Sequence, residues 1–452
     1  MTAVRPAAVA GSFYPADPGA LQRQLAAFLA AARPAAGTIP ADASPKAIIA
    51  PHAGYVYSGP VAAAAYARLA PGRGRISRVI LIGPSHRVAF RGLALGSAEA
   101  WTTPLGPVPI DREAVQALAR LPGVGMLDAA HAQEHSLEVH VPFLQTVLGE
   151  FRLVPVVAGE SPPEAVAALL DAVWGGPETA IVISTDLSHY LDYAGCRAVD
   201  RATVAAIERL DPQGLGRDSA CGRVGVGGLL LTAARRGMTI STLDVRNSGD
   251  TAGPRDRVVG YGAWALWEPD PRRLAPVLIG LARDSIRHGL TSGAPVPVPA
   301  GRPAELDRPG AAFVTLKRDG TLRGCIGSPT AWRPLGEDVA DNAFKAAFRD
   351  PRFPPVAAAE AAGLAVSVSL LTAPAPMLFA DEAGLLAQLR PRFDGLIIED
   401  QGRRALFLPA VWEQLPDPRR FLEQLKLKAG LAAAHWSPGF RASRFQAVEM
   451  TE

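Results

Sequence analysis

The sequence contains little cysteine and little net charge. Only three of its 452 residues are cysteine, and the formal net charge at pH 7 is +3. Three thiols in a chain of this length do not form a disulfide framework, which indicates a reducing compartment. A charge so close to zero provides no electrostatic basis for binding nucleic acid, so we expect no nucleic-acid partner.

Long apolar runs are also missing. Proline, aspartate and glutamine interrupt the first 24 residues, which therefore do not resemble a signal peptide. No stretch has the roughly 20 uncharged residues needed to cross a bilayer. We expect a cytoplasmic protein without membrane association. Hydrophobic residues make up 48% of the chain, enough to build the two or three cores that its length predicts.

Residues 1–268 alternate short apolar runs with helical patterns. The patterns predict strands at 46–50, 77–83, 151–157, 180–186 and 257–267, and helices at 112–121, 163–174 and 196–210. The apolar runs are continuous rather than alternating, which is typical of strands buried on both faces. We predict an α/β domain with a largely parallel central sheet.

The pattern changes after the charged, proline-rich segment WEPDPRRLAP. We predict a linker at 269–274 and a second domain over 275–452. Asp319-Gly320 lies between two strand-like runs and predicts a hairpin. Further expected elements are helices at 277–290, 335–348 and 418–430, and strands at 364–371, 393–400 and 444–450. This mixture indicates an α+β domain.

Three histidines share one context. His52, His86 and His189 each come just after the end of a predicted strand. In an open parallel sheet, ligands bind at the carboxyl ends of the strands. Imidazole is a common ligand for zinc, copper and iron, and a general base near neutral pH. We predict a metal or catalytic site there, with Asp186 as a candidate to orient the His189 ring.

The segment HAQEHSLEVHVPF (131–143) begins with H-x-x-E-H, the zinc signature of one class of metalloprotease. In a continuous helix, His131 and His135 would share a face and Glu134 would be the base. Two points weigh against this hypothesis: Pro142 ends the helical pattern soon after the motif, and the strand-end histidines stay unexplained. The alternative is a helix N-terminus whose acidic residues favour the helix dipole.

The first part of the chain resembles the Memo family. The matching segments are GSFYPAD (11–17), PHAGYVYSG (51–59), GPSH (83–86), EHSLEVHVPF (134–143), STDLSHY (184–190), ACGRVGVGGLL (220–230) and NSGD (247–250). The resemblance implies the fold of class III extradiol dioxygenases, in which two histidines and a carboxylate hold a non-haem iron. It implies that His52 and His86 are metal ligands, and that His189 is catalytic with Asp186 beside it.

The sequence departs from this family at the third ligand. Animal Memo proteins have a cysteine where our pairing places Thr251, a poor ligand for iron or copper. Asp250 could supply an oxygen and restore a site of two histidines and one carboxylate. We expect a divalent metal, iron foremost, with copper or zinc as alternatives. The other residues expected to line this pocket are His135, Glu138, His140, Tyr55 and Asn247.

The second part resembles the AMMECR family. Its marks are LRGCIGS (322–328), NAFKAAFRDPRFPP (342–355), SVSLL (367–371), FDGLIIED (393–400) and LKLKAGL (425–431). Bacterial and archaeal genomes pair the two families with a radical-SAM protein, in the AmmeMemoRadiSam system. The chain is similar to the A and B components of that system joined together, which implies a radical-SAM partner.

Arg323, Gly324 and Cys325 are expected to lie in a cleft of the second domain. The arginine could hold the thiol as a thiolate, although a buried structural cysteine fits the same pattern. Cys221 likewise fits either a reactive thiol or a buried structural cysteine. Three hypotheses follow for the whole protein: a metal-dependent redox enzyme acting on an unknown small molecule or peptide, a non-catalytic adaptor with a vestigial pocket, and a zinc peptidase.

Overall fold

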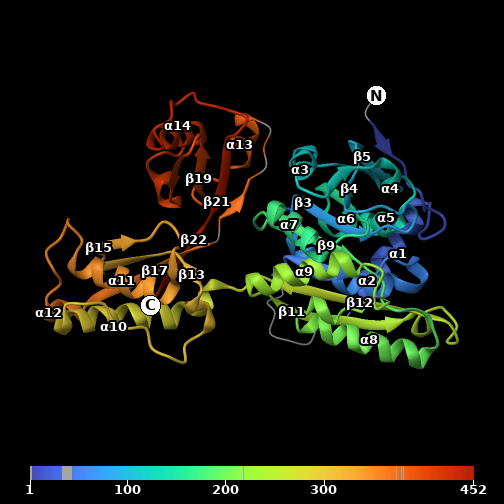
Figure 1. Ribbon diagram of the computed structural model, residues 1–452, viewed down its shortest axis with the longest axis horizontal. Coiled ribbons are helices and arrows are strands. Elements are labelled where there is room, and N and C mark those ends of the chain that lie inside the picture. The colour runs from blue at the N-terminus through green and yellow to red at the C-terminus, as the bar shows by residue number, and fades with distance from the viewer. Residues whose placement is uncertain (1–2, 33–42, 217, 373, 378, 380) are drawn as a thin grey trace. The chain divides into compact units, whose positions relative to one another are not determined.

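The computed structural model describes residues 3–32, 43–216, 218–372, 374–377, 379 and 381–452. It divides into two compact units, Met1–Pro269 and Asp270–Glu452, and each is described by itself (Figure 1). Within the described residues, no helix combines the length and the apolar character required to cross a bilayer.

The main sheet of the first unit is mixed. Its strand order is β10-β12-β2-β9-β3-β8-β4-β7, with β11 paired to β12. The four central strands are parallel: β2 (Ala47–Ala50), β9 (Thr179–Ser184), β3 (Arg78–Pro84) and β8 (Arg152–Ala158). Antiparallel pairs flank them, formed by β10 (His189–Leu191), β11 (Thr239–Asn247), β12 (Val258–Trp267) and β4 (Leu93–Leu95), while β7 (Val124–Met126) runs parallel to β4. The expected parallel arrangement therefore holds only for the centre of the sheet.

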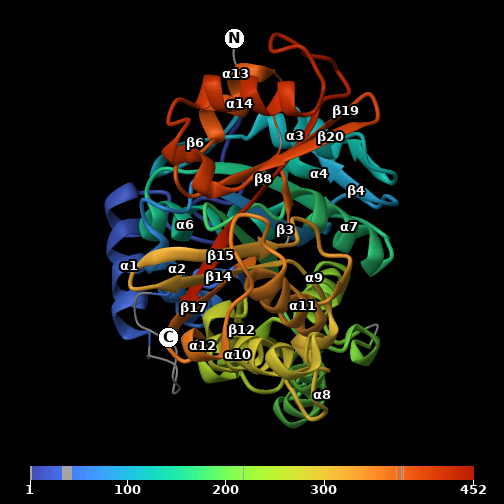
Figure 2. The same ribbon diagram turned by 90° about the vertical axis from the view of Figure 1, so that its left-hand side faces the viewer.

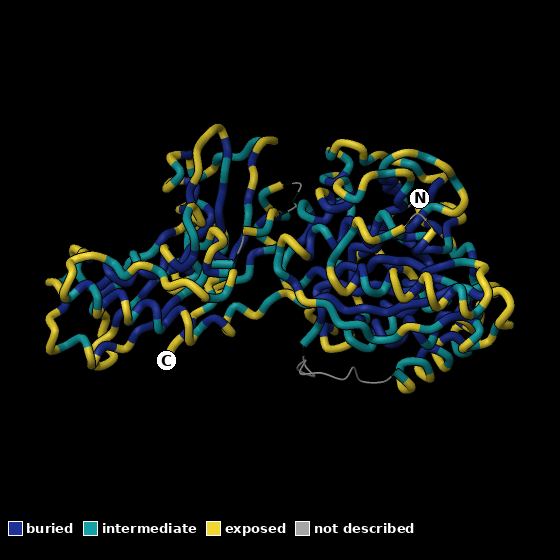
Figure 3. The backbone as a smooth tube through the Cα atoms, turned by 60° about the horizontal axis from the view of Figure 1, so that its bottom comes forward, coloured by how far each residue is buried: buried dark blue, intermediate teal, exposed yellow. Residues whose placement is uncertain are grey.

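Helices cover both faces of this sheet (Figure 2). One face carries α1 (Pro18–Ala31), α2 (Tyr55–Leu69) and α6 (Val141–Leu148), and the other carries α7 (Pro163–Val173), α8 (Tyr193–Glu208) and α9 (Arg223–Arg236). The central strands are consequently buried on both sides, as their continuous apolar sequences predict (Figure 3). A small separate sheet contains β1 (Val4–Arg5), β5 (Ala100–Thr103) and β6 (Gly106–Pro109), and α3 spans Arg112–Leu118.

The H-x-x-E-H segment does not form one helix. It is divided between α4 (Asp128–Ala132) and α5 (His135–Glu138), and α6 begins directly afterwards. Glu134 caps α5, because its carboxylate accepts a hydrogen bond from the Ser136 backbone N–H. Pro142 lies in the first turn of α6, where its missing N–H has no helical partner to lose, so it starts a helix here.

The second unit contains two four-stranded antiparallel sheets, each with its own core, and a two-stranded one formed by β13 (Pro309–Gly310) and β16 (Arg333–Pro334). The first, ordered β15-β14-β17-β22, packs against α10 (Ala275–Ser292) and α11 (Leu335–Phe348). Its strands are β14 (Ala312–Arg318), β15 (Thr321–Gly327), β17 (Leu364–Leu371) and β22 (Ala447–Thr451), and the short helix α12 (Ala358–Ala361) lies nearby. Asp319 and Gly320 both have positive φ, as a tight hairpin turn requires.

The second sheet of this unit is ordered β18-β21-β19-β20. It comprises β18 (Ala375–Pro376), β21 (Arg441–Phe445), β19 (Gly395–Asp400) and β20 (Arg403–Phe407), with α13 (Glu382–Gln388) and α14 (Pro418–Lys428). The single strand predicted at 444–450 is in fact the end of β21 and most of β22, which belong to different sheets. Apolar residues on both sides of Gln446 conceal this change of sheet in the sequence.

Candidate metal centre

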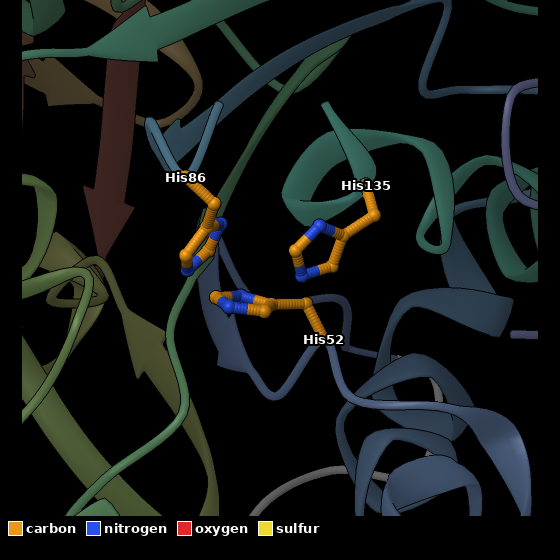
Figure 4. Close-up of side chains that lie close together, drawn as sticks. All are labelled: His52, His86 and His135. Carbon is orange, nitrogen blue, oxygen red and sulfur yellow. The ribbon is translucent and has the colours of Figure 1, made fainter. Parts of the chain in front are cut away.

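Three histidines from separate segments meet at the carboxyl edge of the central strands. His52 follows β2, His86 follows β3, and His135 begins α5. Each offers one ring nitrogen, and the three nitrogens lie within 4.8 Å of one another. The His86 and His135 rings stack with centroids 4.5 Å apart, and the His52 ring stands edge-on to both (Figure 4).

The tautomer of His52 follows from its neighbours. Its Nδ1 lies 2.6 Å from the Ser184 hydroxyl, and that hydroxyl donates its own proton to the Ser136 carbonyl oxygen. Because a hydroxyl has one proton, Ser184 accepts from His52, and the imidazole proton is on Nδ1. The Nε2 atom of neutral His52 therefore carries the lone pair that a metal ligand needs.

Glu134 orients His86 in the same way. One carboxylate oxygen lies 2.9 Å from His86 Nδ1, and the other accepts the His86 backbone N–H at 2.6 Å. A carboxylate can only accept, so Nδ1 carries a proton and Nε2 is the His86 nitrogen left to face a metal. Burial alone would raise the pKa of Glu134, but the hydrogen bonds from His86 and Ser136 outweigh it and lower the pKa to about 2.

The site favours neutral imidazoles. Burial, followed by the neighbouring His86, lowers the pKa of His135 to about 4 and holds that of His52 well below its usual range. The Nδ1 atom of His135 is buried without a hydrogen-bond partner among the described residues. Metal ions bind deprotonated imidazole, so these three donors fit a transition-metal ion.

The cluster is closed on one side and open on the other. His52 is fully buried, His135 is partly buried, and the side chain of His86 is 29% exposed. Phe13 covers His135, with ring centroids 4.7 Å apart. A metal held by three protein ligands with one accessible side leaves room for water or a substrate, which distinguishes a catalytic site from a closed structural one.

Asp186 and Cys221 lie beside His52. Asp186 accepts the His52 backbone N–H at 2.8 Å, and its other oxygen is 4.0 Å from His52 Nε2. Cys221 Sγ lies 3.4 Å from the same Nε2. Burial raises the pKa of Asp186 to about 7 and that of Cys221 to about 12. Both groups are close enough to His52 to influence a metal bound there.

His189 is oriented by a different group from the one we expected. Its Nδ1 donates to the Leu187 carbonyl oxygen at 2.7 Å, whereas Asp186 bonds the backbone of His52. The local turn after β9 places Leu187 within reach, two residues before the ring. Burial lowers the pKa of His189, so the ring is neutral and its Nε2 can accept a proton.

Three of the expected pocket residues have structural partners. Glu138 accepts hydrogen bonds from Arg5, Tyr14 and the backbone of residues 8–9, and so holds the N-terminal segment. Tyr55 donates to the Val139 carbonyl oxygen. His140 is fully buried with Nδ1 bonded to Tyr66, and burial lowers its pKa to about 3.

The residues expected near the third ligand lie elsewhere. Asp250 is exposed and accepts hydrogen bonds from the Tyr193 hydroxyl and the Asn247 backbone. The Asn247 side chain caps the short turn that contains Asp250. Neither belongs to the described cluster of donor atoms, in which His135 supplies the third nitrogen. The loop after β11 is bound to α8, and this contact directs Asp250 to the surface.

The motif in the second unit has a different electrostatic arrangement from the expected one. Arg323 forms an ion pair with Glu360 at 2.6 Å, and Cys325 Sγ accepts a hydrogen bond from Thr315. Gly324 permits close packing: a Cβ atom built on it would lie 2.1 Å from the Ala346 carbonyl oxygen. The glycine therefore brings β15 against α11, while the arginine is committed to a carboxylate.

Sequence reasoning missed Ser184 beside the candidate metal ligands, and it named Cys221 without placing it there. Ser184 sets the tautomer of His52, and Cys221 Sγ lies within hydrogen-bond distance of His52 Nε2. Ser184 is the last residue of β9 and was visible as a polar residue at the end of an apolar run. The signal for Cys221 was weaker, because its position depends on how α9 packs against the sheet.

Comparison with known protein families identifies both units. A family model described as Memo-like protein matches residues 5–265, and one described as AMMECR1 matches residues 279–450. The chain belongs to the Memo family. Its second unit is an AMMECR1 domain, so two domains that the sequence motifs indicated are fused in tandem.

Relatives of the Memo domain are found in archaea. A MEMO1 family protein of Methanothermobacter thermautotrophicus is 39% identical over 275 residues, which cover 57% of this chain and 98% of that protein. A MEMO1 family protein of Sulfolobus acidocaldarius is 35% identical over 277 residues, covering 57% and 97%. Among solved structures, and without assignment to either domain, the crystal structure of an uncharacterized Pyrococcus horikoshii protein is 35% identical to the part of this chain that it matches; the match covers 39% of this chain and 90% of that protein, with a TM-score of 0.34.

Proposed function

We propose that the Memo domain is a metal-dependent oxidoreductase with an open three-histidine centre. The observation that carries the proposal is the convergence of His52, His86 and His135, whose ring nitrogens lie within 4.8 Å of one another. Two of these rings are fixed with their protons on Nδ1 and their Nε2 atoms free. Rings held in this orientation can bind a metal through Nε2 without rearrangement.

Iron is the metal we propose first, with copper and zinc as alternatives. Imidazole suits all three, and a nearby carboxylate or thiol can shift the preference between them. When bound, such a metal would supply Lewis-acid or redox chemistry at the accessible side of the cluster. The chain itself would contribute neutral His189, whose Nε2 can take up or return a proton at that site.

Metal analysis tests the proposal. Full-length protein purified without oxygen should carry close to one metal ion per chain by elemental mass spectrometry. His52→Ala, His86→Ala and His135→Ala should each abolish the bound metal, with the fold checked by circular dichroism. His131→Ala is the matched control, since His131 donates to the Ala94 carbonyl oxygen outside the cluster and should leave metal content unchanged.

The alternatives predict different results. A zinc peptidase built on H-x-x-E-H would lose zinc in the His131→Ala variant and keep it in His52→Ala. The division of that motif between α4 and α5 does not support this alternative. An adaptor with a vestigial pocket would be purified without metal. Wild-type protein that carries no stoichiometric metal would overturn our proposal.

We also propose that the fused domains act with a radical-SAM protein. The tandem of a Memo domain and an AMMECR1 domain in one chain supports a shared task. Full-length protein mixed with the purified radical-SAM protein from the same organism should form a complex in analytical ultracentrifugation. Separate sedimentation at every concentration tested would contradict the partnership, and would leave the metal centre unaffected.

A further inference from the structure

Two tyrosines that follow His189 hold three arginines against their rings. The Arg257 guanidinium lies 4.5 Å from the centroid of Tyr190, and Arg255 and Arg197 lie 4.6 and 5.8 Å from that of Tyr193. All three arginines are exposed. A guanidinium stacked on a ring keeps its in-plane N–H groups free, and these form the paired hydrogen bonds that carboxylates and phosphates accept.

These arginines have no carboxylate partner among the described residues. Arg255 makes one long hydrogen bond, from Nε to the Gly249 carbonyl oxygen at 3.4 Å. Two nearby acids are committed elsewhere: Asp192 caps α8 through the Gly195 N–H, and Asp250 accepts from Tyr193. Asp256, between two of the arginines in sequence, forms no ion pair with either. None of the three guanidinium groups is therefore ion-paired to a carboxylate of the described residues, and their in-plane N–H groups can bind an external anion.

Tyr190 is held in an unfavourable backbone conformation. Its φ is 61°, in the left-handed region that non-glycine residues rarely adopt, and the residue is 62% exposed. It lies at a bulge in the pairing of β10 with β12, between His189 and Leu191. The bulge turns the ring toward solvent, edge-on to His189 with centroids 5.6 Å apart. Strained bulges of this kind re-aim side chains and are frequent beside active sites.

We propose that Arg197, Arg255 and Arg257 form an oxyanion-binding rim that recognises the acidic group of the substrate. The expected substrate is a small organic acid, a carboxylate or a phosphate ester. Tyr190, which carries Arg257, lies edge-on to His189, so an anion bound to Arg257 would be held beside His189, the acid–base residue of the proposed histidine site. This inference rests on the proposed function, because it assumes that the histidine site receives a substrate.

The rim is tested on metal-free full-length protein, so that the metal centre does not contribute to binding. Benzoate and inorganic phosphate are titrated by isothermal calorimetry, with benzamide as the neutral counterpart of benzoate. The variant R197Q/R255Q/R257Q should lose at least about tenfold in affinity for the preferred anion, as removal of charge-assisted hydrogen bonds predicts. Benzamide should not bind to either protein.

A second triple variant controls for net charge. R75Q/R120Q/R209Q removes three other exposed arginines of the same unit and should retain wild-type anion affinity. Equal losses in the two triple variants, or no anion binding by the wild type, would overturn the proposal. The relative affinities of benzoate and phosphate distinguish a carboxylate from a phosphate substrate.

Tyr190→Asn tests the rim without removing charge. Asparagine tolerates the left-handed conformation better than tyrosine, so the thermal midpoint should rise. The variant lacks the ring that positions Arg257, so anion affinity should fall. Unchanged anion affinity in this variant would refute the role of the Tyr190 ring in positioning Arg257. Wild-type protein that binds anions but no metal would refute the proposed redox function and leave the anion-binding rim supported. Wild-type protein that binds metal but no anions would refute the rim and leave the metal centre supported.

Discussion

Glu134→Gln is the substitution that most directly tests how the candidate metal centre is held. Glu134 accepts three hydrogen bonds, from His86 Nδ1, the His86 backbone and the Ser136 backbone, at 2.9, 2.6 and 3.0 Å. Glutamine has the same shape but only one accepting atom. Its NH₂ group would face a buried N–H donor wherever it is placed, and at least one of these bonds would be lost.

The size of the effect follows from the same contacts. The pKa of Glu134 falls from 4.5 to about 2, and a shift of this size corresponds to about 3 kcal/mol of folding stability. Because the folded-state pKa is depressed, that stability is present above pH 4.5 and is lost as the pH falls toward 2. At neutral pH we expect Glu134→Gln to destabilise the domain by about 2–3 kcal/mol. Metal affinity should fall by about 10–100-fold, as is usual when a group that orients a metal-bound histidine is removed.

Glu138→Gln is the matched control. Glu138 is a buried carboxylate four residues away with an equally complete set of donors, none of which is a histidine. Urea unfolding should show comparable destabilisation of both variants. Competition with a chelator of known affinity should show weakened metal binding only for Glu134→Gln. Wild-type metal affinity in Glu134→Gln, or an equal loss in both variants, would refute the role of Glu134 in orienting His86.

Further predictions concern pH and packing. His131 and His135 have pKa values of about 4 against an ordinary value of 6.5, so the unfolded chain takes up protons first as the pH falls below 6.5. Urea unfolding of metal-free protein should show each group lowering stability by about 2 kcal/mol at pH 5, and a flat profile from pH 8 to 5 would contradict this. In the AMMECR1 domain, Gly324→Ala should destabilise by about 1–3 kcal/mol through its clash with Ala346, measured by chemical denaturation. Gly280→Ala in α10 has open space and should be neutral or stabilising.

Local sequence predicts the central part of the fold well. The runs at 46–50, 77–83, 151–157 and 180–186 become β2, β3, β8 and β9, because strands buried on both faces need uninterrupted apolar sequence. The flanks of the sheet are harder to predict. β11 is a nine-residue strand of mostly half-exposed residues and shows no clear period. Its pairing with β12 is decided by contacts that no local pattern encodes.

The candidate site also depends partly on local sequence and partly on contacts between segments distant in sequence. The strand-end rule brings His52 and His86 together, because position after a parallel strand is a local property with a spatial meaning. The third donor cannot be chosen in this way. Proximity in sequence to a family motif favoured Asp250, whereas the structure brings His135 to the cluster and leaves Asp250 at the surface. That choice depends on where α5 and the loop after β11 dock on the sheet.

The H-x-x-E-H motif shows why residue types alone do not determine a mechanism. In an unbroken helix the two histidines would share a face and Glu134 would be free to act as a base. Here Arg5 donates hydrogen bonds to the carbonyl oxygens of His131 and Glu134, at 2.7 and 2.9 Å, where the chain leaves its helical path. The break assigns His131 to the core and His135 to the cluster, and it commits Glu134 to orienting His86. The residue types of the motif are unchanged, but the break that Arg5 bridges determines which of them belongs to the candidate metal site.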